Sequence, residues 1–157
     1  MSKLAIYLND HLAGATAGTE LAKRARDANE GNEYGSELER IAAEIEEDRV
    51  SLQIMMDELE VGHDRFKEGA GWLAEKFGRL KLNGSLLEYS PLSRLIEIEG
   101  LYLGVQGKLS MWRNVQASLG ERVEAVDLDA LIERASSQAE RLEGLRTRAA
   151  AEALTTD

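Results

Sequence analysis

Several polar residues occupy positions where the helical periodicity of this sequence calls for apolar ones. The clearest is Asp48, which interrupts a series that contains Ile41, Ile45, Leu52 and Met55. A carboxylate on an inward-facing stripe could bind a metal ion, act as an acid or base, or pair with a buried cation. The polar residues on the predicted inward stripes are His11, Asp48, Glu99, Gln106, Gln138 and Arg146. We therefore expect a polar layer inside the fold.

Metal binding is one possible role for this layer, with His11, Asp48 and Glu99 as candidate ligands. Di-iron helical bundles use roughly four carboxylates and two histidines, delivered partly as Glu-x-x-His motifs. This chain has 2 histidines in total. Its Glu-x-x-His match, Glu60 to His63, falls where Gly62 is expected to end a helix. The sequence therefore favours a structural layer with no metal or cofactor, and it leaves a mononuclear site open.

A structural layer requires a partner for Asp48, because an unpaired buried carboxylate costs several kcal/mol. If the first two helices fold back about residues 31–32, His11 lies about one turn from Asp48. We predict His11 as the first-choice partner and an inward-reaching arginine as the second. The other polar residues expected at matching heights are Glu99 with Arg146, and Gln106 with Gln138.

Catalysis is disfavoured by the same residues. A serine nucleophile would need His11 or His63 as its base, and these are expected deep in a stripe and at a helix end. Asp48 and Glu99 could act as an acid–base pair only in a cleft, for which the sequence gives no sign. We therefore expect a protein that is not an enzyme.

Composition narrows the remaining classes. The chain carries 19 basic and 29 acidic residues, a net charge of −10, which disfavours binding to nucleic acid. It contains no cysteine, so thiolate ligands, thiolate nucleophiles and disulfides are excluded. Its first residues do not resemble a signal peptide, and its apolar stretches are too short to cross a bilayer. We expect a cytoplasmic location.

The elements that must position these residues are helices. The sequence has one proline and 5% aromatic residues, and its apolar residues repeat at helical spacing. We predict a single domain, residues 1–157, with helices over about 3–29, 37–60, 64–81, 91–119 and 127–154. Three N-terminal caps are predicted: a Ser36/Glu39 capping box, Ser90 followed by Pro91, and Asp127.

The predicted fold class is all-α, an antiparallel four-helix bundle. About 30 residues separate the second and third long helices, enough to run the length of a bundle at about 1.5 Å per residue. This favours ferritin-like connectivity, with a long helical crossover that contains the helix over 64–81. An up-down-up-down bundle with that helix across one end is the alternative.

Two stretches carry a resemblance. "YLNDHLAGATAG" and "IEEDRVSLQIMMDELEV" resemble the first and second helices of bacterioferritin-type proteins. That resemblance implies a ferritin-like shape, but the family's ligand positions fall on Ala15, Ile45 and Asp48. The sequence as a whole resembles small uncharacterised actinobacterial helical proteins through "YLNDHLAG" and "GRLKLNG…YSPLSR", which implies no activity.

Two surfaces suggest partners. The predicted helix over 91–119 is apolar around most of its circumference, which favours a homo-oligomer, most simply a dimer. The predicted helix over 64–81 carries basic residues that could dock on a protein or a membrane surface: Arg65, Lys67, Lys76, Arg79 and Lys81. We therefore expect a helical-bundle protein that acts through self-association or partner binding. The alternatives are a metal-carboxylate protein with an altered ligand set and a docking module that uses the basic helix.

Overall fold

The computed structural model describes residues 2–64 and 88–155, and these residues form helices and short connections without a strand. The long helices are α1 (Lys3–Ala28), α2 (Gly35–Glu58), α4 (Pro91–Leu119) and α5 (Leu128–Thr155); a short 3₁₀ turn, η1 (Gly120–Arg122), follows α4. The all-α prediction is confirmed for this part of the chain. The predicted helix over 64–81 lies, beyond Asp64, outside the described residues.

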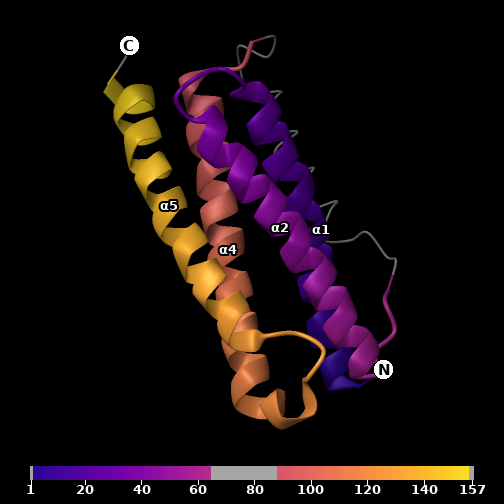
Figure 1. Cartoon of the computed structure of the whole chain (residues 1–157). Helices are drawn as coiled ribbons and strands as arrows, with labels where there is room; N and C mark the ends of the chain where they lie inside the picture. The colour runs from indigo at the N-terminus through magenta and orange to yellow at the C-terminus, as the bar shows by residue number, and fades with distance from the viewer. Residues whose placement is uncertain (1, 65–87, 156–157) are drawn as a thin grey trace.

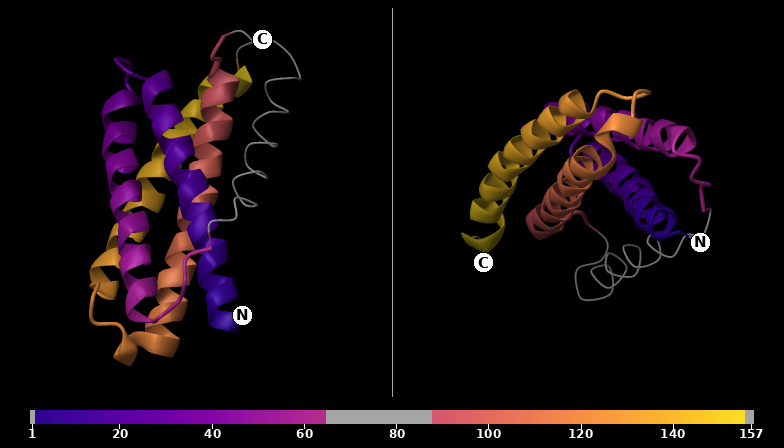
Figure 2. Two further views of the ribbon diagram at one scale, coloured as in Figure 1. Left: turned by 90° about the vertical axis from the view of Figure 1, so that its right-hand side faces the viewer. Right: turned by 90° about the horizontal axis from the view of Figure 1, so that it is seen from below.

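The four long helices lie side by side as two antiparallel hairpins, α1 with α2 and α4 with α5 (Figure 1). α4 packs closely against both α5 and α1, so it lies between them when the molecule is seen from below (Figure 2). α2 ends near the end of the molecule at which α1 begins, whereas α4 begins at the opposite end (Figure 1).

The central position of α4 explains its wide apolar surface. The sequence of this helix contains more apolar residues than one core usually needs. In the structure most of them are buried against the neighbouring helices: Leu95, Ile98, Leu101, Val105, Leu109 and Trp112. A helix flanked on two sides needs a wider apolar stripe than a peripheral helix. The width of this stripe therefore reflects packing within the chain and does not by itself indicate a dimer.

Two of the three predicted caps are confirmed. Ser90, directly before Pro91, forms a capping box with Ser93, and Asp127 accepts a hydrogen bond from the backbone N–H of Ala130 at 3.0 Å. The third cap is wrong, because α2 already begins at Gly35 and Ser36 lies inside the helix. The turn before α2 is held instead by Asn32, whose Oδ1 accepts the backbone N–H of Tyr34 at 2.9 Å.

The buried apolar side chains form two clusters, one toward each end of the helices. The first contains Tyr34, Leu38, Ile98 and Leu142, and the second contains Leu8, Met55, Trp112 and Leu131. Asp48 falls between them, because Ile45 belongs to the first cluster and Leu52 to the second.

Among the described residues, no helix combines the length and the apolar character needed to cross a bilayer.

Candidate functional site

Asp48 is the centre of a charged layer that crosses the core between the two apolar clusters. Its side chain is about 1% exposed, and both carboxylate oxygens accept hydrogen bonds. Oδ1 accepts two from the guanidinium of Arg134, one of them from Nε at 2.8 Å. Oδ2 accepts one from Lys108 Nζ at 2.5 Å and one from Gln138 Nε2 at 3.0 Å. We call Asp48, Lys108, Arg134 and Gln138 the charged layer.

Lys108 joins α4 to this layer. Its ammonium donates to Asp48 and also to Gln138 Oε1 at 2.5 Å, although it lies deep between the helices. Burial lowers the pKa of Lys108, while the attraction of Asp48 acts in the opposite direction. The carboxylate therefore offsets only part of the cost of removing the ammonium from water.

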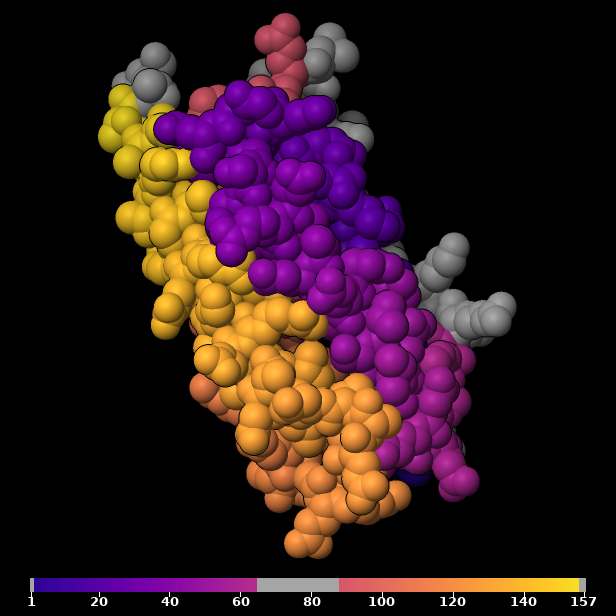
Figure 3. All heavy atoms as spheres, viewed as in Figure 1, coloured from indigo at the N-terminus to yellow at the C-terminus, as the bar shows by residue number. Residues whose placement is uncertain are grey.

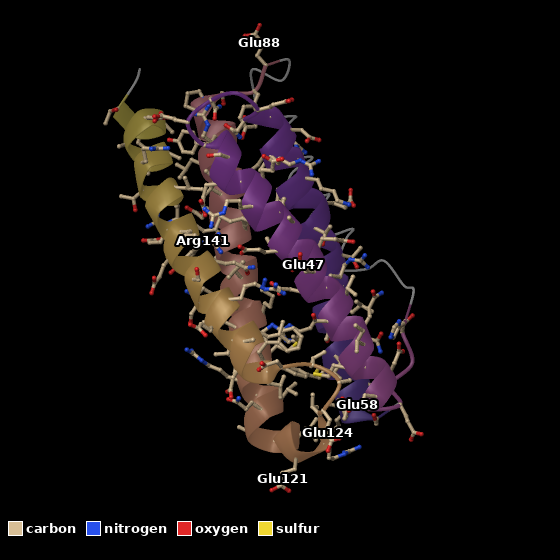
Figure 4. All side chains as sticks on the ribbon, viewed as in Figure 1. Glu47, Glu58, Glu88, Glu121, Glu124 and Arg141 are labelled. Carbon is tan, nitrogen blue, oxygen red and sulfur yellow. The ribbon has the colours of Figure 1, made fainter. Side chains whose placement is uncertain are left out.

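Further ion pairs extend the layer toward solvent between α2 and α5. Arg134 contacts Glu47 at 2.8 Å, and Arg141 contacts Glu37 at 2.9 Å and Glu44 at 2.5 Å. Figure 4 labels Glu47 on α2 and Arg141 on α5, on the two sides of this contact. Burial acts to raise the pKa of Glu44, but hydrogen bonds from Arg141 and Gln138 prevail and lower it.

The structure corrects the predicted partner of Asp48. The first choice, His11, is wrong: its ring packs edge-on against Tyr7, with the ring centroids 4.7 Å apart. Burial lowers the pKa of His11, which favours the neutral imidazole. The second choice, an inward-reaching arginine, is confirmed as Arg134. Asp48 points toward α4 and α5, whereas His11 lies on α1.

The other predicted pairs are not formed. Glu99 is exposed, and Arg146 forms its ion pair with Glu143 on its own helix at 2.7 Å. Gln106 donates to Tyr102 at 3.2 Å and does not contact Gln138. Of the six residues predicted for the polar layer, Asp48 and Gln138 are brought together.

Glu97 is a buried carboxylate that the sequence reasoning missed in favour of Glu99. It is 2% exposed, and its nearest cation is Arg24 of α1, with Nε 3.3 Å from Oε1. Neither of its oxygens has a hydrogen-bond partner of normal geometry among the described residues. Burial raises the pKa of Glu97 to about 6, against the opposing effects of Arg24 and of the Tyr89 hydroxyl. Glu97 lies on the same helical stripe as Leu101 and Val105, and this spacing could have identified it as a buried residue.

The raised pKa of Glu97 predicts a specific pH dependence. The folded state binds more protons than the unfolded chain between about pH 4.5 and about 6, so this group makes stability fall as the pH rises through that window. We expect Glu97→Gln to abolish this fall and to raise the free energy of unfolding at pH 7 by about 2 kcal/mol. Urea denaturation at several pH values measures both effects. Glu99→Gln, an exposed change on the same helix, is the control, and equal pH slopes in wild type and Glu97→Gln would contradict the prediction.

A second polar cluster joins all four helices at the end where α1 meets α2. Asn29 is fully buried and accepts a hydrogen bond from Arg94 Nε at 2.7 Å. The guanidinium groups of Arg94 and Arg148 each lie 4.5 Å from the centroid of the Tyr34 ring. Tyr34 Oη donates to Glu152 at 2.9 Å. This cluster fixes the relative positions of the helix ends.

The chemistry available to these groups is limited by their pairing. Asp48 is fully engaged as an acceptor, and Lys108 is held between two acceptors, so neither is free to take or give a proton to a ligand. Within residues 2–64 and 88–155, no three histidine, aspartate or glutamate side chains gather as a metal ion would require.

Comparisons with protein-family models, curated proteins and solved structures find no match for this chain. The resemblances to bacterioferritin-type and actinobacterial helical proteins stay predictions.

Proposed function

We propose that this chain is a non-enzymatic, cytoplasmic helical-bundle protein that acts through self-association, with the charged layer fixing how its helices align. The observation that carries the aligning role of the layer is the pairing of Asp48, whose two oxygens accept from three side chains of the other hairpin. A polar group that is satisfied only in one alignment of the helices disfavours the others. Such a layer has a structural use without any ligand.

We propose ferritin-like connectivity for this bundle. The directions of the helices support it: α2 ends at one end of the molecule and α4 begins at the other, so α2 and α4 run the same way (Figure 1). An up-down-up-down bundle would instead require α4, the third long helix, to run opposite to α2. α4 also packs closely on α1.

The outer face of α4 supports self-association. Leu103 is 62% exposed and Leu92 is also exposed, on a helix that carries no charge from Gly100 to Gly107. A Cβ atom added at Gly104 or Gly107 would meet nothing within 4 Å. We name Leu92, Leu103, Gly104 and Gly107 the α4 outer face. A second copy can approach closely there and cover the exposed leucines.

We expect sedimentation velocity to show a dimer that dissociates on dilution. Leu103→Glu places a charge in the centre of the α4 outer face and should raise the dissociation constant at least about tenfold. Leu154→Glu is the control, because Leu154 is 71% exposed but lies at the end of α5. A wild-type protein that is monomeric at high concentration, or equal effects of the two variants, would contradict the proposal.

The two alternatives gain no support from the described residues. The metal-carboxylate alternative lacks a group of ligands there, since His11 and Glu99 lie apart from the charged layer. The docking alternative uses Arg65, Lys67, Lys76, Arg79 and Lys81, which lie outside the described part of the chain. It stays a prediction.

A further inference from the structure

The line along which α2 faces α5, here called the α2–α5 seam, differs from the other helix contacts. The backbones of α2 and α5 approach each other far less closely than those of α1 and α2, α4 and α5, or α1 and α4. Side chains nevertheless fill the space between the two ribbons, and the surfaces of α2 and α5 meet along the front of the molecule (Figure 3). Contact across the seam therefore depends on long side chains.

Many of those long side chains are polar, and they lie beside apolar residues of α2 and α5 that share the two core clusters. From α5, three residues at successive turns reach across the seam: Arg134, Gln138 and Arg141. Their acceptors on α2 are carboxylates: Glu37, Glu44, Glu47 and Asp48. Removing one charge from a buried set of ion pairs leaves its partners uncompensated and so weakens the contact strongly.

The other interfaces hold the chain as two units. A short connection joins α1 to α2 and another joins α4 to α5, so each hairpin stays together without the seam. The hairpins also meet where α1 packs on α4, on the side of the molecule away from the seam (Figure 2). A rotation of one hairpin about the α1–α4 contact would open the seam without separating either hairpin.

We propose that the two hairpins open along the α2–α5 seam and that the charged layer, through Asp48, holds the seam closed. Asp48 belongs to the α1–α2 hairpin, and Lys108, Arg134 and Gln138 all belong to the α4–α5 hairpin. Opening breaks all of these contacts together and returns both cations to water. It also uncovers the apolar neighbours of Asp48 on α2, Ile45 and Leu52.

The burial of Lys108 weakens the closed state. The lowered pKa of this lysine reports that its ammonium is under-compensated in the closed state. The free-energy cost of removing paired charges from water offsets much of the attraction between them. The closed state is therefore favoured by only a small net free energy. An equilibrium of this kind is shifted by small changes in charge.

Spin labels can measure the opening directly, because the full chain contains no cysteine to remove. Ala43→Cys with Ser137→Cys places one label on an exposed position of each side of the seam. Thr16→Cys with Arg113→Cys places labels on exposed positions of α1 and α4, across the contact that should not open. Samples are diluted with unlabelled protein, so that distances between copies do not contribute.

Asp48→Asn is then introduced into both labelled proteins. We expect the fraction of long distances across the seam to rise about tenfold, while distances between α1 and α4 stay unchanged. Glu39→Gln, an exposed acid on α2, is the matched control and should alter neither pair. If Asp48→Asn does not fold, Arg141→Gln removes only the outer ion pairs with Glu37 and Glu44 and should give the same pattern more weakly.

Two results would overturn the proposal. Seam distances unaffected by loss of the Asp48 charge would show that the layer does not hold the hairpins together. Equal lengthening between α1 and α4 would show a general loosening of the helices rather than opening along one seam.

Discussion

Replacing Asp48 with alanine is expected to lower the free energy of unfolding by about 3–5 kcal/mol, because the change leaves buried donors without their acceptor. Lys108 loses one of its two acceptors, and Arg134 keeps only its contact with Glu47. Breaking a buried ion pair by removing one partner costs more than never having had the pair. Urea denaturation measures the change, provided that the slope with urea concentration stays the same.

A double-mutant cycle tests whether the destabilisation by Asp48→Ala comes from the loss of its contact with Lys108. Lys108→Met alone should cost little, since Asp48 keeps Arg134 and Gln138 and a buried ammonium is removed. The protein with both Asp48→Ala and Lys108→Met should be more stable than the sum of the single effects implies. His11→Leu is the matched control, because His11 does not contact Asp48 and should be additive with it. Additivity in the Lys108 cycle would contradict the assigned contact.

The helices could be predicted from the sequence because their apolar spacing is a local property. The bounds of α4 agree with the prediction, and those of α1, α2 and α5 differ from it by one or two residues. The presence of Asp48 inside the fold follows from the same spacing, since a residue between Ile45 and Leu52 on one stripe has to face inward.

The partners of Asp48 could not be predicted, because they depend on how each helix is rotated about its axis and on which residues of neighbouring helices lie at the same height. A helix turns by about 100° per residue, so a carboxylate on an inward stripe can face either of two neighbours. Asp48 faces α4 and α5 rather than α1, which removes His11 and selects Arg134. Lys108 was missed because a long side chain reaches the core from the edge of a stripe. Glu97 and Glu99 show the same limit, since only the first is buried.

The junction of α1 and α2 gives the next largest expected effect, through Gly35. A Cβ atom at this position would lie 2.5 Å from the carbonyl oxygen of Asn29, which is backbone and cannot rotate away. Asn29 is itself held in the polar cluster by Arg94, so the clash has to move the turn or the start of α2. We expect Gly35→Ala to lower the free energy of unfolding by about 1–3 kcal/mol, measured by urea denaturation.

Gly144→Ala separates this clash from the ordinary effect of replacing a helical glycine. Gly144 lies within α5 and is exposed, and an added Cβ would meet nothing within 4 Å. Alanine should therefore stabilise the protein there by about 0.5–1 kcal/mol, because it restricts the unfolded chain and favours the helix. The two substitutions are expected to change the free energy of unfolding in opposite directions, because an added Cβ meets the backbone at Gly35 and open space at Gly144. A stabilising Gly35→Ala would mean that the turn yields easily, and that the contact between α2 and Asn29 does not determine where α2 begins.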